Sequence, residues 1–260
     1  MILLLLLLIA LPLSAQISSG GGIVAIAPPA GQPSVQPTFW HKMPNGLGTT
    51  VTAFLGDDCI NSNGTAWPSF GTNNFALDYD ANDDLTACGT NYDALPNTAF
   101  TITAWVKADG YGEAGTGRIL SKSSGTNSSW SFTISNTSAV NRLQIKCATN
   151  TSNSGDSFVG DTGHFDAYVG LTTLTFVAAT CSCPTAMACA GDLFINGAQI
   201  NDTQSNDATG TPVDDTAYTL NIGSLQGGGN TWDGSIDDVR IYPAILTAEQ
   251  ILWVYLGGHQ

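Results

Sequence analysis

The chain has 260 residues, and its 21 acidic side chains against only 7 basic ones give a formal net charge of −14 at pH 7. So few cations argue against a nucleic-acid-binding protein and against attachment to an anionic membrane surface, because both need clustered Lys and Arg. Hydrophobic residues make up 43% of the chain, which excludes an intrinsically disordered protein.

The first fifteen residues predict a signal peptide. An apolar run extends from Ile2 to Leu13 and is followed by a small residue, Ala15. The run is too short to cross a hydrocarbon core of roughly 30 Å, and its length is typical of the hydrophobic part of a signal peptide. We therefore expect cleavage before Gln16, a secreted or extracellular location, and no membrane insertion of the mature chain. An uncleaved anchor is the alternative interpretation.

Residues 16–38 predict a linker or an extended arm, because they are rich in Gly, Ser and Pro. Within this leader, the short apolar run from Ile23 to Ala27 has the composition of a strand. The remaining residues, 39–260, predict one β-rich domain.

Strand-like segments separated by Asn, Asp, Gly and Ser follow one another from residue 39 onward, a pattern typical of a β-sandwich or barrel. Alternating or continuous apolar residues predict strands over 100–107, 130–134, 143–147, 171–179, 220–222 and 236–242. Asn196-Gly197 predicts the type I′ turn of a hairpin over 193–200. Thr247 and Gln250 form a capping box that predicts a helix. The chain is therefore predicted to be all-β, an antiparallel sandwich with one short C-terminal helix.

The cysteines predict disulfide bonds. Their number is even, which suits an oxidising compartment, and the chain contains no CxxC pair of the kind that binds zinc. The six are Cys59, Cys88, Cys147, Cys181, Cys183 and Cys189. Because the last three lie in one short stretch, we expect at least one of them to bond a more distant cysteine.

Seven segments carry a family resemblance when they are taken in order. They are Phe70–Leu77, Phe100–Lys107, Arg118–Lys122, Leu193–Gly197, Tyr218–Gly223, Trp232–Tyr242 and Leu246–Ile251. The series resembles the laminin-G-like (concanavalin A-like lectin/glucanase) superfamily over residues 66–257. The resemblance implies a jelly-roll sandwich that is extracellular, binds carbohydrate or protein surfaces and often holds calcium. It departs from the family where a Trp-His pair is usual and Ala167-Tyr168 stands instead.

A glycoside hydrolase is not expected, although a minority of the superfamily hydrolyses glycosidic bonds. Hydrolysis needs two carboxyl groups close together, and the family's hydrolases use paired glutamates on one strand. This chain has only Glu113, in a Gly-rich loop, and Glu249, in the predicted helix cap. We therefore predict a non-catalytic protein.

Calcium is the expected cofactor, because the chain's many Asp and Asn residues supply the oxygen ligands that Ca²⁺ prefers. The resemblance implies a structural site at Asp237, aided by a carbonyl near Gly71. A second candidate is the acidic loop that contains Asp78, Asp80, Asn82 and Asp84. The alternative interpretation of that loop is a solvated acidic segment.

Sugar recognition would need exposed aromatic rings that stack on apolar sugar faces. Trp105 points away from the apolar stripe of its strand, and the other candidates lie in predicted loops. The candidate ligand-binding residues are Tyr92, Trp105, Tyr111, Tyr168 and Trp232. For each of them, packing in the core or at its rim is the alternative.

Two functions follow from these patterns. The first is a secreted non-catalytic binding module that recognises carbohydrate or an extracellular surface ligand, with a structural calcium. The second is an assembly subunit of an extracellular filament or surface layer. In that case the run from Gly22 to Ala27 would add as a strand to a neighbouring copy and form a homo-oligomer.

Overall fold

The computed structural model describes residues 31–42, 49–62, 76–82, 84–91, 99–123, 128–135, 142–149, 155–160, 173–183, 188–206 and 213–257. The predicted signal peptide and the apolar run at residues 23–27 lie outside these ranges. So do Gly71, Tyr92 and Tyr168, so the predictions made for them stay predictions.

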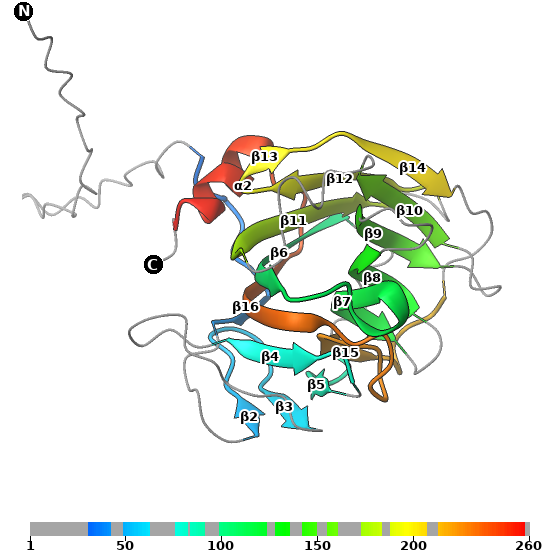
Figure 1. The fold of residues 1–260 in the computed structure, drawn as a ribbon. Coiled ribbons are helices and arrows are strands. Elements are labelled where there is room, and N and C mark those ends of the chain that lie inside the picture. The colour runs from blue at the N-terminus through cyan, green and yellow to red at the C-terminus, as the bar shows by residue number, and fades with distance from the viewer. Residues whose placement is uncertain are drawn as a thin grey trace, which may run out of the picture.

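Two antiparallel sheets face each other across one core (Figure 1). The seven-stranded sheet has the order β1 (Phe39–His41), β16 (Asp233–Tyr242), β6 (Ala99–Ala108), β11 (Thr175–Ser182), β12 (Ala190–Ile195) and β13 (Ala198–Gln199), with β4 (Leu77–Asp80) also paired to β16. The nine-stranded sheet has the order β14 (Asp202–Asn206), β10 (Gly155–Gly160), β9 (Arg142–Thr149), β8 (Ser128–Ser135), β7 (Thr116–Ser123), β15 (Thr219–Ile222), β5 (Leu85–Ala87), β3 (Cys59–Ser62) and β2 (Thr50–Val51). A short 3₁₀ turn, η2 (Glu113–Gly115), precedes β7. The predicted all-β sandwich is confirmed.

The period-two pattern of β6 explains how one strand serves two surfaces. Successive side chains of a strand point to opposite faces of the sheet. Phe100 and Ile102 are fully buried in the core between the sheets. Thr103 and Trp105 face the opposite, outer side of the seven-stranded sheet.

The C-terminal helix, α2 (Ala248–Tyr255), covers part of this outer face. Its Ile251 and Val254 pack with Phe176 and Tyr242 in a second, smaller apolar cluster. The predicted capping box is confirmed, because the Thr247 hydroxyl accepts a hydrogen bond from the backbone N–H of Gln250 and the Gln250 side chain accepts one from that of Thr247. The helix is thus held by its cap and by an apolar face.

The hairpin turn between β12 and β13 supports the same helix. Asn196 and Gly197 have φ values of 51° and 78°, the positive values that a type I′ turn requires. A Cβ atom on Gly197 would lie 2.9 Å from Cδ1 of Leu252, so the turn touches α2 closely.

The end of the predicted leader also contacts α2. Gly31 lies against the backbone of Glu249, and Val35 packs against the apolar cluster under the helix. The segment just before residue 39 therefore lies on the domain.

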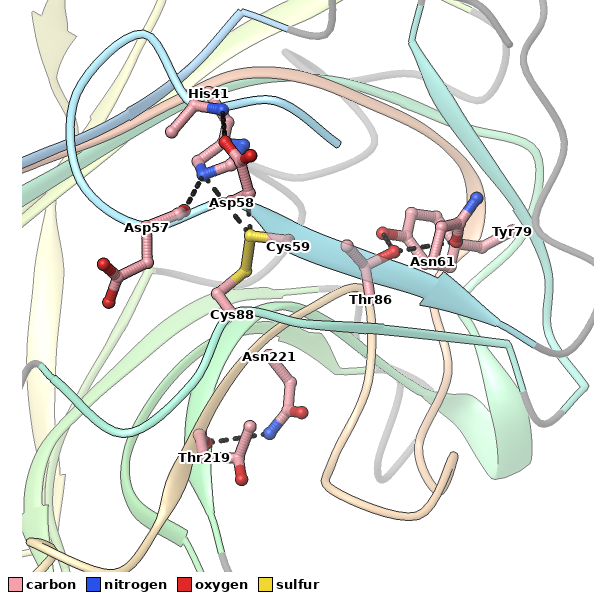
Figure 2. Close-up of a disulfide and its surroundings, with 11 residues drawn as sticks. His41, Asp57, Asp58, Cys59, Asn61, Tyr79, Thr86, Cys88, Thr219 and Asn221 are labelled. Carbon is pink, nitrogen blue, oxygen red and sulfur yellow. Dashed lines mark hydrogen bonds between the residues drawn. A yellow bond between two sulfur atoms is a disulfide. The ribbon is translucent and has the colours of Figure 1, made fainter. Parts of the chain in front are cut away.

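Three disulfides link the six cysteines: Cys59–Cys88, Cys147–Cys181 and Cys183–Cys189. Cys147 lies on β9 and Cys181 on β11, so this bond crosses the core and joins the two sheets. It confirms that one of the three clustered cysteines bonds a distant partner. Figure 2 shows the Cys59–Cys88 bond beside the buried ring of His41.

Candidate functional site

A β-bulge in β16 shapes the outer face of the seven-stranded sheet. Asp237 pairs with Trp105 of β6, and Arg240 pairs with Thr103, so two residues of β16 stand opposite one of β6. Asp238, inside the bulge, has a φ of 48°. Bulges re-aim side chains and are common beside functional sites. Here the bulge turns Asp237 and Arg240 to the same outer face.

An ion pair anchors the bulge. Arg240 donates to Asp238 through Nε (2.9 Å) and Nη2 (2.6 Å), and the Trp40 indole N–H donates to the same carboxylate (2.6 Å). The Arg240 guanidinium also lies 4.2 Å from the centre of the Trp40 ring. Burial, the largest single effect, lowers the pKa of Arg240, but the charge of Asp238 and its hydrogen bonds, together with a smaller contribution from Tyr242, outweigh burial and raise this pKa. Arg240 and Asp238 therefore form a charged ion pair on the outer face of the sheet.

Asp237 lies in a different electrostatic environment. Burial and then the charge of Asp238 raise its pKa to about 7, against the weaker effects of the Asp238 N–H, Lys42 and Arg240. Its Oδ1 accepts the hydrogen bond from that N–H (2.6 Å). Near neutral pH this carboxyl can donate as well as accept hydrogen bonds.

Aromatic side chains form the wall opposite these charges. The ring of Trp105 lies 5.6 Å, centre to centre, from Phe176 of β11 and 5.6 Å from Tyr255 of α2. Both Trp105 and Tyr255 are only partly buried. The helix thus brings a second aromatic ring beside the predicted one.

These walls enclose a pocket of about 420 Å³. Its lining residues are Lys42, Trp105, Leu174, Asp237, Asp238, Arg240, Val254, Tyr255, Leu256 and Gly257. An apolar pocket with a few converging polar groups is typical of small-ligand sites. Aromatic rings beside carboxylates and a guanidinium can stack on a sugar ring and hydrogen-bond its hydroxyl groups.

The structure brings together two residues that were predicted for different roles, Trp105 for sugar and Asp237 for metal. Sequence analysis missed Tyr255, Asp238 and Arg240. The run Asp237-Asp238-Val239-Arg240 was visible in the sequence, but no local pattern reveals that a bulge turns its polar members to one face.

The other aromatic candidates lie elsewhere. Trp232 is fully buried in the main core, so the prediction that it offers a ring to a ligand is wrong for this structure. The error has a physical reason, because the backbone N–H of Trp232 donates a hydrogen bond to the carbonyl of Gly223, which holds the residue before β16 against the core. Tyr111 is partly buried and packs against the same core.

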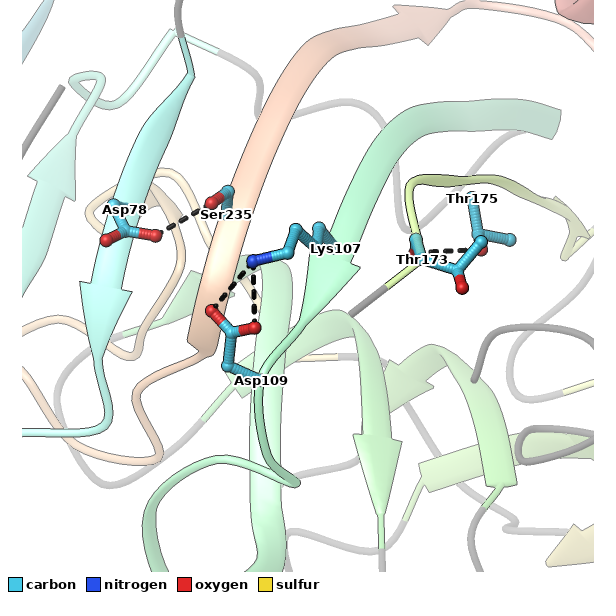
Figure 3. Close-up of polar contacts among 6 residues, drawn as sticks. All are labelled: Asp78, Lys107, Asp109, Thr173, Thr175 and Ser235. Carbon is cyan, nitrogen blue, oxygen red and sulfur yellow. Dashed lines mark hydrogen bonds and ion pairs between the residues drawn. The ribbon is translucent and has the colours of Figure 1, made fainter. Parts of the chain in front are cut away.

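Two carboxylates of the predicted acidic loop accept hydrogen bonds from other residues of the chain. Asp78 accepts a hydrogen bond from Ser235 (2.7 Å), as Figure 3 shows, and Asp84 accepts one from the backbone of Asp80 (2.9 Å). Burial and the nearby carboxylates of Asp109, Asp80 and Asp78 raise the pKa of Asp233. No three His, Cys, Asp or Glu side chains of the described residues form a group that could hold a metal ion. Calcium therefore stays a prediction.

A family model described as the concanavalin A-like lectin/glucanases superfamily matches residues 80–252, more than half of the chain. The chain belongs to the concanavalin A-like lectin/glucanase superfamily. Among curated proteins, no sequence is similar enough to this superfamily member to count as a match.

Solved structures with this fold include binding domains of toxins and a domain of an enzyme. Domain 4 of a GH43 extracellular arabinanase from Geobacillus stearothermophilus, in complex with arabinotriose, has a TM-score of 0.55 and 13% identity over 84% of this chain and 97% of that one. The ligand-binding domain of botulinum neurotoxin serotype D, in complex with N-acetylneuraminic acid, has a TM-score of 0.60 and 15% identity over 85% of this chain and 50% of that one. The type G receptor-binding domain has a TM-score of 0.58 and 13% identity, with 85% and 51% covered.

These likenesses establish the concanavalin A-like fold, since all three identities are low. The chain spans about half the length of the botulinum neurotoxin structures. Its three disulfides indicate an oxidising, extracellular type of environment. Within the described ranges, none of the helices has the length and apolar character needed to span a membrane.

Proposed function

We propose that this superfamily member is a secreted, non-catalytic module that binds carbohydrate in the pocket between α2 and β16. One observation carries the proposal: the partly exposed rings of Trp105 and Tyr255 lie beside the buried carboxyl of Asp237 in a pocket of about 420 Å³. The similar structures solved with arabinotriose and with N-acetylneuraminic acid support a carbohydrate as the ligand class.

The absence of catalysis is part of the proposal. Glu113 lies in η2, where its carboxylate accepts a bond from the Thr231 backbone, and Glu249 lies in α2 on the other sheet. In the pocket, Asp238 is committed to Arg240 and Trp40. A pair of free carboxylates that could act as acid and base is therefore not found among the described pocket residues.

A structural calcium at Asp237 remains part of the proposed function. A buried carboxyl with a raised pKa gains stability from a bound cation. Ca²⁺ takes about six to eight oxygen ligands, so Asp237 would need further oxygens, and a carbonyl near Gly71 is the proposed source. Thermal unfolding with Ca²⁺ and with EDTA tests this, and an identical midpoint in both would remove calcium from the proposal.

A glycan array with the full chain, run with Ca²⁺ and again with EDTA, tests the main proposal. We expect a restricted set of neutral or acidic glycans to bind, and a blank array in both conditions would contradict it. The matched variants are Trp105→Ala, which removes the pocket ring, and Tyr218→Ala, which removes a partly buried aromatic ring just before β15 of the other sheet. We expect W105A to weaken binding about tenfold, the loss typical of an aromatic contact, and Y218A to leave it unchanged.

A second candidate, assembly of copies, is favoured by one observation. Phe54, Leu55 and Ile60 are 65%, 37% and 54% exposed near the edge strand β2. The run from Gly22 to Ala27 of another copy is the proposed occupant of that edge. Size-exclusion chromatography of a chain starting at Gly31 tests this, because an unchanged oligomeric state would exclude strand addition by the leader.

A further inference from the structure

The outer face of the nine-stranded sheet gathers basic side chains that the sugar pocket does not use. The apolar residues of β8 point into the core, so the alternating Ser131 and Thr133 face outward. Thr133 pairs with Arg118 of β7, and Ser131 pairs with Lys146 of β9. One cation therefore lies on each side of a strand whose Ser131 and Thr133 point away from the core but are covered, with only 2% and 3% of their surface exposed.

A third cation lies on the same face. Arg142 of β9 pairs with Ser135 of β8, two residues along from the Thr133 position. We call Arg118, Arg142 and Lys146 the basic face. It holds three of the seven Lys and Arg residues. Three cations therefore lie on one face although the chain as a whole has a net charge of −14.

Three donors of the basic face, all on its two arginines, have no hydrogen-bond partner within the described residues. Nε and Nη1 of Arg118 and Nε of Arg142 are buried and have no hydrogen-bond partner there. Buried polar groups in native proteins nearly always have a partner, which can be a bound ion or water. An unpaired charged donor is costly to keep, so a site for an acceptor is the physical explanation.

The electrostatics agree with this explanation. Burial lowers the pKa of Arg118 to about 10. Burial and then the positive charge of Arg118 lower the pKa of Lys146. The charged forms of Arg118 and Lys146 are thus destabilised by their surroundings, and an anion between these two side chains would stabilise both.

We propose that the basic face binds the carboxylate of an acidic sugar, such as a uronic acid, within a glycan chain. Each unpaired N–H of a guanidinium can donate a strong, charge-assisted hydrogen bond to a carboxylate oxygen. Lys146, across one intervening strand and so about 10 Å away at the backbone, reaches the same group with its long side chain. The inference rests on the proposed carbohydrate function and adds a second contact point on the opposite sheet.

The net charge of the chain also limits which acidic glycans we expect to bind. A net charge of −14 repels a densely charged polyanion at long range. A glycan with isolated acidic residues carries fewer negative charges, so this repulsion is smaller for it.

Calorimetry with one matched ligand pair tests the proposal. The probe is a xylo-oligosaccharide that carries one glucuronic acid, and its control is the methyl ester of the same oligosaccharide. We expect the acid to bind the full chain about tenfold more tightly than the ester, and we expect this advantage to shrink at 0.5 M NaCl. Equal affinity for acid and ester, or no binding of either, would overturn the proposal.

Two lysine variants isolate the responsible charge. Lys146→Gln removes a cation of the basic face, and Lys107→Gln removes the exposed lysine that pairs with Asp109 on the other sheet. We expect K146Q to abolish the preference for the acid and K107Q to retain it. Arg118→Gln should act like K146Q, and K146Q keeps the test valid if the buried change at Arg118 prevents folding. A preference that survives in K146Q would contradict the proposal.

The failure of this inference can be told apart from failure of the proposed function. If W105A loses glycan binding while K146Q behaves like the unchanged protein, the sugar pocket stands and the basic face is only structural. If K146Q alone loses the acid preference while W105A binds normally, the basic face stands and the pocket proposal falls.

Discussion

His41 is a buried ionisable side chain with no role in either site. Its Nε2 donates to the Asp57 carbonyl (2.9 Å) and lies 3.3 Å from Cys59 Sγ. Burial lowers its pKa to about 4, against the opposing bond to Asp57 and the charge of Asp58. The native state therefore favours the neutral imidazole.

This burial predicts a loss of stability in acid. The unfolded state, with a His pKa near 6.5, binds a proton that the native state releases until the pH falls to about 4. The stability that the protein gains from a neutral His41 is complete above pH 6.5. It is lost as the pH falls from 6.5 to 4, which lowers the free energy of unfolding by about 3 kcal/mol. Urea unfolding at pH 7 and pH 4.5 of the natural protein and of His41→Gln measures it. The difference between the two proteins should shrink in acid, and a constant difference would contradict the prediction.

Asp238 accepts the side-chain hydrogen bonds that hold the bulge in place. Its carboxylate binds Nε and Nη2 of Arg240 and the indole N–H of Trp40. Asp238→Ala should lower the free energy of unfolding by about 3–5 kcal/mol, since it leaves a buried guanidinium without its partner. The double variant Asp238→Ala, Arg240→Met should recover part of that loss, because it removes the unpaired charge. Denaturant unfolding of the natural protein, Asp238→Ala and the double variant checks both, and a double variant no more stable than Asp238→Ala would exclude this account.

At the scale of elements, the helix α2 does two things at once. It closes a small apolar cluster on the outer face of the sheet, and its last turn supplies Tyr255 and Leu256 to the pocket. The capping box at Thr247 sets where this helix begins. The local stability of α2 should therefore be coupled to ligand binding.

Thr247→Ala tests that coupling. Loss of the cap should cost about 1 kcal/mol of stability and weaken glycan binding, because the helix wall of the pocket then frays. Thr247→Ser keeps the capping hydroxyl and is expected to match the natural protein in both measurements, unfolding and calorimetry. Weakened binding by the Ser variant would show that the methyl group, not the cap, matters.

At the scale of the whole molecule, one disulfide holds the two sheets together. Cys147–Cys181 closes a sequence separation of 34 residues across the core, whereas Cys183–Cys189 closes only 6. In the loop-entropy model these correspond to about 4 and about 2 kcal/mol.

Removing each bond as a pair of serines should therefore destabilise the protein unequally. We expect the Cys147→Ser, Cys181→Ser double variant to lose about twice as much unfolding free energy as the Cys183→Ser, Cys189→Ser double variant. Thermal and urea unfolding under oxidising conditions compare the two. Equal losses would mean that the cross-sheet bond is no more important than the local one.

The elements of the fold were largely predictable because their causes are local. The alternation over residues 100–107, the Asn196-Gly197 turn and the Thr247 cap each depend on neighbours within a few positions, and all three are confirmed. The family resemblance was carried by contiguous segments for the same reason, and the matched family model confirms it.

The sites were decided only by the tertiary structure. Trp105, Asp237 and Tyr255 meet because β6 pairs with β16 and α2 packs across both, and the three basic-face cations meet through the register of β7, β8 and β9. Trp232 looked like a loop residue, yet the closing of the sandwich buries it. The amino-acid sequence by itself determined which segments are strands and which residues can carry chemistry. Only the folded chain decided which of these residues share a surface, because pairing register, bulges and disulfide partners depend on contacts between distant segments.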